Sequence, residues 1–208
     1  MENTNKSLKG SKSSVLTVKN MSKIAILSAV SFILMIFDFA LPFLPPFYKF
    51  DFSEAVVMIG TFAMGPIAGV WIEGIKIILN AFIHGTQTAY IGEFAAFFMG
   101  IAYIIPAGII YQKEHSIKGA VKGMIVGTIL TSIVAMITNY YLLLPAYVTF
   151  AGFTMDAIIA WTNSINPFIT DIFTLIIIGT LPFNLIKWTI ISIIVKLLYK
   201  HVSPILKK

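Results

Sequence analysis

The chain has 208 residues, of which 58% are hydrophobic and only 12% are charged. A soluble domain carries about a quarter of its residues as charged side chains, so most of this chain is expected to face lipid. The absence of cysteine excludes disulfides, thiol catalysis and thiolate metal sites. The net charge of +6 comes from lysines at the ends of apolar segments. These lysines lack the interleaved aromatic residues of a nucleic-acid surface, so nucleic acid is not an expected partner.

The composition along the chain predicts a polar tail, then a membrane domain, then a second tail. Residues 1–20 are rich in Ser, Lys and Asn and are expected to form a flexible cytoplasmic tail, residues 21–200 a membrane domain, and residues 201–208 a basic cytoplasmic tail. The domain contains six apolar segments: Ser22–Leu41, Phe52–Met64, Ile67–Ile83, Gly92–Tyr111, Ile117–Leu144 and Asp171–Tyr199. We therefore predict an all-α integral membrane protein, a bundle of six transmembrane helices, with the second segment short for a full span.

Two breaks and one long connection divide these segments. The prolines of the sequence LPFLPP end the first segment, and Gly65-Pro66 separates the second from the third. The connection of residues 145–170 is too long for a simple turn between neighbouring helices. Connections of this length are usually functional or carry a short helix of their own.

The lysines indicate the orientation in the cell membrane. Twelve of the 15 lysines lie at the amino-terminal flank, around the connection between the fourth and fifth segments, or at the carboxyl end. These three regions share one side only if there are six crossings, and lysine-rich flanks face the cytoplasm. Both termini are therefore predicted to be cytoplasmic. The opposite side carries Lys49, whose positive charge is offset by Asp51 and Glu54.

The third segment carries four polar residues at intervals of three and four, which places them on one helical face: Glu73, Lys76, Asn80 and His84. Such residues are costly within a membrane. Glu73 and Lys76 are predicted mainly to neutralise each other as an ion pair, although they would also suit an ion-coupled carrier. Asn80 lies nearer the outer end of the third segment.

The fifth and sixth segments carry the polar groups that best suit a binding site. Asn184 and Lys187 are three residues apart and follow Pro182, which frees a backbone acceptor at a kink. Together they offer donors and acceptors on one face. Asn139 adds an amide beside Tyr140, although interhelical contact explains Asn139 equally well.

Small residues recur at intervals of four in the first and fifth segments, at Ala25 and Ala29 and at Gly119, Gly123 and Gly127. This spacing permits close helix contact. The sequence contains no nucleophile–base constellation, HExxH motif or phosphate-binding loop, so we do not expect an enzyme. Active uptake would need energy from a partner or an ion gradient.

The segment pattern and several motifs resemble the substrate-binding S components of energy-coupling factor (ECF) vitamin transporters, and most closely the riboflavin-binding family. The resemblance covers roughly residues 22–200. It rests on PFLPPFYKFDFSE at 42–54, TFAMGPIAG at 61–69, Asn139-Tyr140 followed by LLLPAY, and LPFN at 181–184 with Lys187.

The resemblance implies a vitamin pocket near the outer face, with riboflavin as transported substrate rather than cofactor. The substrate-binding residues that it implies here are Asn139, Asn184, Lys187, Tyr48, Lys49, Phe50, Asn80, Glu93 and Tyr140. Ala96 departs from the asparagine that relatives often carry. The resemblance also places Ala25 and Ala29 against a membrane-embedded coupling protein, which works with two ATPases. Another vitamin, or an ion-coupled carrier using Glu73 and Lys76, remains an alternative.

Overall fold

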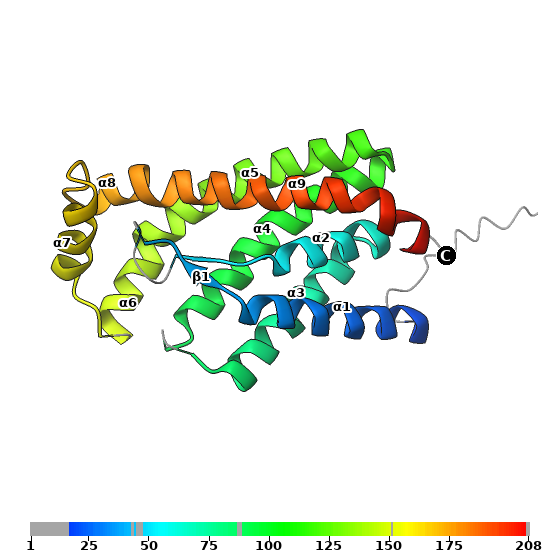
Figure 1. Cartoon of the computed structure of the whole chain (residues 1–208), viewed down its shortest axis with the longest axis horizontal. Helices are drawn as coiled ribbons and strands as arrows, with labels where there is room; N and C mark the ends of the chain where they lie inside the picture. The colour runs from blue at the N-terminus through cyan, green and yellow to red at the C-terminus, as the bar shows by residue number, and fades with distance from the viewer. Residues whose placement is uncertain (1–16, 43, 45–47, 87–88, 151, 207–208) are drawn as a thin grey trace, which may run out of the picture.

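The computed structural model describes residues 17–42, 44, 48–86, 89–150 and 152–206. The α-helices are α1 (Val18–Ile36), α2 (Ser53–Met64), α3 (Pro66–Leu79), α4 (Ile91–Glu114), α5 (Ile117–Thr138), α6 (Leu144–Phe150), α7 (Met155–Ile165), α8 (Ile172–Thr174) and α9 (Leu181–Leu206). Three π-helical segments interrupt or extend them: η1 (Asn80–His84), η2 (Asn139–Leu143) and η3 (Leu175–Thr180). The long helices run along one axis, and the start of α1 lies at the same end of the bundle as the end of α9 (Figure 1).

Five continuous helical stretches are long and apolar enough to cross a membrane: Val18–Ile36, Pro66–His84, Ile91–Glu114, Ile117–Phe150 and Ile172–Lys200. The helix α2 is apolar but has only 12 residues, which rise about 18 Å against a hydrocarbon thickness of about 30 Å. The predicted helical membrane bundle is confirmed. The exact count of six crossings stays a prediction.

The helix ends differ from the predicted boundaries. The helix α1 begins at Val18, four residues before Ser22, because the Thr17 side chain caps it by accepting a hydrogen bond from Asn20 N at 3.3 Å. It ends at Ile36, before the predicted Leu41. At the other end of the chain α9 continues to Leu206, so the predicted tail at 201–208 is largely helical. Residues 1–16 of the predicted first tail lie outside the described residues.

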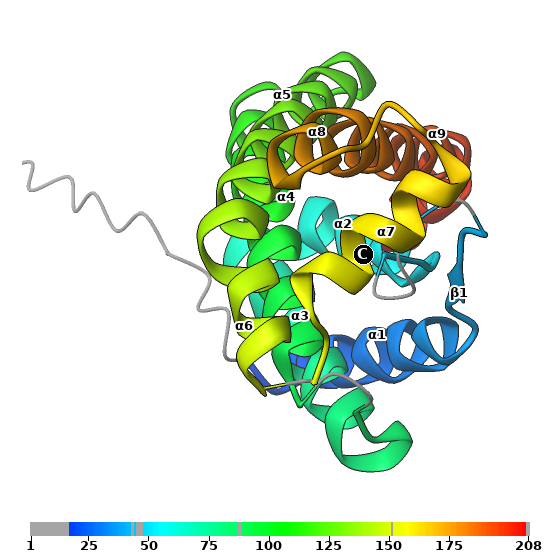
Figure 2. The same cartoon turned by 90° about the vertical axis from the view of Figure 1, so that its left-hand side faces the viewer.

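The chain between the fifth and sixth predicted segments is mostly helical. The fifth stretch continues through η2 and α6 to Phe150, six residues beyond the predicted Leu144. The separate helix α7 then crosses the end of the bundle opposite the two termini, as Figure 2 shows. Its Ile158 is buried with Leu144 and Leu175, which anchors α7 to the bundle. The expected short helix in this long connection is confirmed.

The first loop is a small hairpin that approaches the same end. The strands β1 (Phe39–Ala40) and β2 (Lys49–Phe50) pair antiparallel, with Phe39 opposite Phe50 and Ala40 opposite Lys49. The ring centroids of Phe39 and Phe50 lie 5.5 Å apart. This pairing holds the backbone of Lys49 beside α9.

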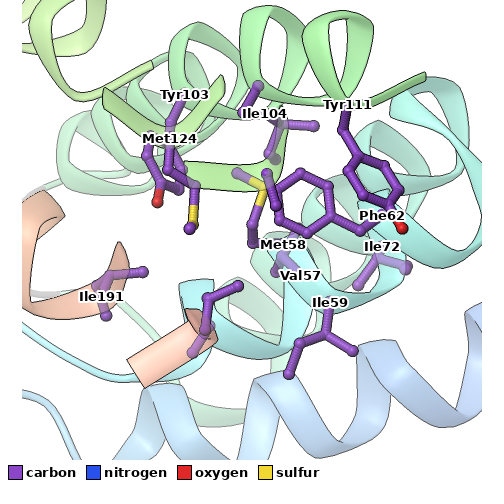
Figure 3. Packing of buried hydrophobic residues seen from close by; sticks show 14 of the residues in the cluster. Val57, Met58, Ile59, Phe62, Ile72, Tyr103, Ile104, Tyr111, Met124 and Ile191 are labelled. Atoms are coloured by element: carbon purple, nitrogen blue, oxygen red, sulfur yellow. The ribbon is translucent and has the colours of Figure 1, made fainter. Parts of the chain in front are cut away.

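The main apolar core lies nearer the end that holds the termini. It joins α2, α3, α4, α5 and α9 through side chains such as Met58, Phe62 and Tyr111 (Figure 3). The Phe62 and Tyr111 ring centroids are 4.5 Å apart. Because the core occupies this half, the polar residues of α3, α5 and α9 gather in the other half.

The glycine spacing in α5 serves close packing, as predicted. A Cβ at Gly123 would lie 2.6 Å from the Ala107 carbonyl oxygen, and a Cβ at Gly127 would lie 2.8 Å from the Tyr103 carbonyl oxygen. Only a residue without a side chain permits α4 and α5 to approach this closely. The α4–α5 contact therefore depends on these glycines.

We expect Gly123→Ala to lower the free energy of unfolding by about 1–3 kcal/mol, because the added methyl group meets backbone that cannot move aside cheaply. Thermal unfolding of the purified protein measures the effect. Gly74→Ala is the matched control, since its Cβ would lie 3.6 Å from Phe97, an ordinary contact. Equal melting temperatures for the two variants would contradict the proposed role of Gly123.

Candidate functional site

A polar cavity lies at the end of the bundle opposite the start of α1 and the end of α9, lined by residues of α1, the hairpin, α2, η1, α4, α5, η2 and α9. Its volume is about 170 Å³, many times the requirement of one water. Its charged and amide-bearing lining residues are Asp38, Lys49, Asp51, Glu54, Asn80, Glu93, Asn139, Asn184 and Lys187. Its apolar and aromatic walls include Met35, Tyr48, Met99, Leu143, Tyr147, Phe183 and Trp188. A few polar groups among apolar and aromatic side chains suit a small organic molecule.

Two π-helical segments contribute to the lining of this cavity, η1 through Asn80 and η2 through Asn139. The third, η3, ends at Thr180, four residues before the lining residue Asn184. A π turn places one extra residue in a turn and is frequent at functional sites. The backbone of these helices therefore departs from α geometry at or next to the residues that line the cavity.

Lys187 is fixed at one end of the cavity by two partners from the first loop. Its ammonium donates to the Lys49 carbonyl oxygen at 3.2 Å and to Asp51 Oδ2 at 3.2 Å. The other oxygen of Asp51 accepts hydrogen bonds from Ser53 N, at 2.9 Å, and from Ser53 Oγ. The side chain of Lys187 remains 14% exposed, so its ammonium is positioned but not enclosed.

Asp51 stays ionised at this position. Burial by itself would raise the pKa of its carboxyl, but the ammonium groups of Lys187 and Lys76 and the hydrogen bonds from Ser53 outweigh burial and lower the pKa below its ordinary value. The stabilising contribution of Asp51 is therefore complete at neutral pH and is lost only as the pH falls through this lowered pKa.

We expect Asp51→Asn to lower the free energy of unfolding by about 1.5–3 kcal/mol, because Lys187 loses its charged partner in a partly buried setting. Thermal unfolding at neutral pH checks this. Glu114→Gln is the control, since its pair with Lys122 is exposed and exposed pairs contribute within about 1 kcal/mol. If both substitutions cost the same, Asp51 does not hold Lys187 as described.

The two predicted asparagines are held in fixed orientations by their own helices. Asn184 Nδ2 donates to the Thr180 carbonyl oxygen at 2.9 Å, and its Oδ1 accepts from Trp188 Nε1 at 3.2 Å. Asn139 Nδ2 donates to the Ala135 carbonyl oxygen at 2.8 Å. An amide has two N–H donors and two acceptor lone pairs, so each group keeps further capacity for a ligand in the cavity.

Tyr48 joins the hairpin side of the cavity to these two helices. Its hydroxyl lies 2.6 Å from Thr180 Oγ1 and donates to Asn139 Oδ1 at 3.4 Å. Its ring packs edge-on against Phe183, with centroids 5.3 Å apart. Tyr48 therefore links the start of β2 to η3 and η2 and helps to set the orientation of Asn139.

The opposite wall carries a second polar group. Asn80 is buried, and among the described residues its Oδ1 atom has no hydrogen-bond partner. Glu93, on α4, accepts a hydrogen bond from Thr86 Oγ1 at 3.0 Å. Ala96 also lines the cavity and contributes no polar atom, so Glu93 is the polar lining residue that α4 supplies. This wall can accept hydrogen bonds from a ligand.

Seven of the nine residues that the resemblance implied line one cavity: Tyr48, Lys49, Asn80, Glu93, Asn139, Asn184 and Lys187. The other two lie outside the lining. Phe50 is buried beside Phe39 and Phe52, and Tyr140 is exposed and contacts Tyr141. Tyr140 turns away because neighbouring residues of a helix point in different directions, and Asn139 already faces inward.

Several lining residues were not expected from the sequence. Asp38 had no predicted role, although it pairs with Lys49 at 3.0 Å. Asp51 and Glu54 were predicted only to offset Lys49. Trp188 follows Lys187 directly and also lines the cavity. The sequence signal that could have indicated Trp188 was the motif LPFN with Lys187, which lies on the same part of α9.

A buried ionic cluster on α2 and α3 adjoins the cavity, which its member Glu54 lines. The ammonium of Lys76 is 2.7 Å from Glu73 Oε2, 2.8 Å from Glu54 Oε1 and 3.2 Å from Ser53 Oγ. The side chains of Lys76, Glu73 and Glu54 are almost fully buried. The predicted pair between Glu73 and Lys76 is confirmed, and Glu54 is a partner that the sequence did not indicate. Within the described ranges, no group of three or more His, Asp or Glu residues is arranged to hold a metal ion.

The bundle and its enclosed polar cavity define a membrane protein that binds a small molecule at one end. The sequence model described as "ECF transporter, substrate-specific component" matches residues 19–199. The chain belongs to this family.

Curated relatives and a solved structure agree with that assignment. The riboflavin transporter RibU of Staphylococcus aureus (strain TCH60) is 34% identical over 191 residues, covering 91% of this chain and 93% of that protein. The riboflavin transporter FmnP of Bacillus subtilis (strain 168) is 32% identical over 190 residues, covering 90% and 93%. A solved S component of a bacterial ECF transporter superposes with a TM-score of 0.72 at 33% identity, covering 91% of this chain and 98% of that one.

Proposed function

We propose that this protein is the riboflavin-binding subunit of an ECF-type importer. One observation carries the proposal: two oriented amides and one ammonium, from Asn139, Asn184 and Lys187, converge on one cavity with aromatic and aliphatic walls. The pyrimidine edge of a flavin presents carbonyl oxygens and an N–H in one plane. Amide and ammonium groups complement that edge, and the apolar walls complement the ring faces. The names of the relatives RibU and FmnP point to the same ligand.

The contacts within the protein favour tight binding. Trp188 and Thr180 hold the Asn184 amide, Ala135 holds the Asn139 amide, and Asp51 holds Lys187. Groups that are already ordered lose little conformational entropy when a ligand arrives. The ligand therefore meets donors and acceptors that need little rearrangement.

The direction of transport follows from the lysines and the position of the cavity. The positive-inside rule places both termini in the cytoplasm of a multi-pass protein of the cell membrane. The cavity is at the opposite end of the bundle, so it faces the outside. The helix α7 lies across that end and would close on the bound vitamin (Figure 2).

Delivery across the membrane would require partners. A membrane-embedded coupling protein and two ATPases would supply the energy, as the family implies. Ala25 and Ala29 are exposed on α1. Small exposed residues four apart allow another helix to approach closely, so this face of α1 is the proposed contact with the coupling protein.

Uptake of labelled riboflavin in a host without its own riboflavin transporter tests the whole proposal. We expect uptake only when this protein is expressed together with an ECF coupling module. Uptake without that module would favour the ion-coupled carrier instead. Failure of uptake with a module that supports another S component would contradict the assignment to riboflavin.

A further inference from the structure

A second candidate site lies at the end of the bundle that holds both termini. A groove runs between α5 and α9, and its lining residues are Ile117, Lys118, Val121, Lys122, Ile125, Val126 and Lys196. Its floor is aliphatic, and three lysines stand around it. The riboflavin proposal uses none of these residues.

The geometry of α5 places the lysines and the aliphatic floor on one outward face. Lys118 and Lys122 are four residues apart, and Val121 and Ile125 continue the same stripe at intervals of three and four. The opposite face of α5 carries Gly123 and packs against α4. The outward stripe therefore faces the surroundings of the bundle, and Ile125 is 54% exposed.

The lysines stand near the ends of membrane-spanning stretches, where a chain is expected to reach the membrane surface. Lys118 and Lys122 stand in the first two turns of α5, which begins at Ile117. Lys196 stands about one turn before Lys200, where the last membrane-spanning stretch ends. Ammonium groups at this level meet the phosphate layer of the lipid, while the aliphatic floor continues toward the hydrocarbon.

The groove has an excess of positive charge. Lys122 pairs with Glu114 at 2.8 Å, whereas Lys118 and Lys196 form no ion pair within the part of the chain that the structure describes. Basic pockets between transmembrane helices bind anionic lipid headgroups. A free soluble anion would make no favourable contact with the aliphatic floor, whereas the acyl chain of a lipid would pack against it.

We propose that this groove binds one anionic phospholipid, with its phosphate between Lys118, Lys122 and Lys196 and an acyl chain along Val121 and Ile125. The lipid comes from the leaflet at the end that holds both termini. The groove lies across the bundle from α1, as Figure 2 shows for α5 and α9. The lipid would therefore stay bound while the exposed face of α1 contacts another protein.

Native mass spectrometry of the delipidated full-length protein tests the site. The protein is mixed with equal amounts of phosphatidylglycerol and phosphatidylcholine that carry identical acyl chains. We expect one phosphatidylglycerol to be retained preferentially. Binding of both lipids to the same extent would overturn the proposal, and this comparison needs no variant.

Two triple variants separate the groove from general surface charge. Lys118→Gln/Lys122→Gln/Lys196→Gln should weaken retention of phosphatidylglycerol by about tenfold or more. The matched control Lys23→Gln/Lys113→Gln/Lys200→Gln removes the same charge at the same end outside the groove, and its retention should change less than about twofold. An equal loss in both variants would mean general attraction and would overturn the site. Displacement of the lipid by glycerol phosphate alone would show a soluble anion site and would overturn the lipid assignment.

Discussion

Replacing Lys76 by methionine will destabilise the protein more than any other single substitution considered, by about 3–5 kcal/mol. The substitution leaves Glu54 and Glu73 buried beside each other without the ammonium that lies 2.8 Å and 2.7 Å from them. A buried carboxylate without a partner costs several kcal/mol. The melting temperature of the purified protein, measured at neutral pH, gives the effect.

A triple variant shows whether the cost comes from the unpaired charges. Lys76→Met/Glu54→Gln/Glu73→Gln removes the three charges together, and replacing a whole buried ion cluster by neutral groups is often nearly neutral. We therefore expect the triple variant to recover most of the stability lost by Lys76→Met. If the triple variant is as unstable as the single one, the cluster contributes through its packing and not through its charges.

The single variant Glu73→Gln separates the binding subunit from the ion-coupled carrier, because Glu73 lies outside the cavity lining and Lys76 keeps its partner Glu54. A carrier that uses Glu73 and Lys76 would lose transport when Glu73 is neutral. A riboflavin-binding subunit whose cluster is structural would keep its affinity, because the flavin contacts in the proposal come from Asn139, Asn184 and Lys187. Loss of riboflavin binding in a folded Glu73→Gln protein would contradict the structural role of the cluster.

The second large effect is expected at the cavity itself. Asn184→Ala and Lys187→Met should each weaken riboflavin binding by about 1–3 kcal/mol, which corresponds to roughly 5–150-fold, because each removes a buried hydrogen-bonding partner. Asn184→Ala also frees Trp188 Nε1, which donates to Asn184 Oδ1 at 3.2 Å. Fluorescence titration of riboflavin with the purified variants measures the change.

The control for these variants is Tyr141→Ala, because Tyr141 lies on the same end of the bundle and is 75% exposed. Its riboflavin affinity should equal that of the unchanged protein. Unchanged affinity in both cavity variants would place the flavin elsewhere. An equal loss in all three variants would indicate general damage to the fold.

The sequence predicted the membrane helices and three of the polar cavity residues for a physical reason. Charged and amide side chains are costly in lipid, so Asn139, Asn184 and Lys187 stand out within apolar segments. The pair between Glu73 and Lys76 was predictable because residues three apart share a helical face. Local spacing and composition were sufficient for these inferences.

The partners that lie far away in sequence were not predictable in the same way. Asp51 is 136 residues from Lys187, and Glu54 is 22 residues from Lys76. Their roles depend on how the first loop and α2 pack against α9 and α3, which a single sequence does not show. The π-helical segments at Asn80 and Asn139 also have no compositional signature, because an apolar run looks the same whether its turns are α or π.

The most direct test of the account is the titration of riboflavin fluorescence with the purified, full-length protein, with another vitamin as competitor. The account predicts saturable quenching at one riboflavin per protein, insensitive to an excess of the unrelated vitamin. It also predicts that protein from a riboflavin-rich culture is yellow and releases flavin on denaturation. A folded protein that is colourless and leaves riboflavin fluorescence unchanged would contradict the central claim.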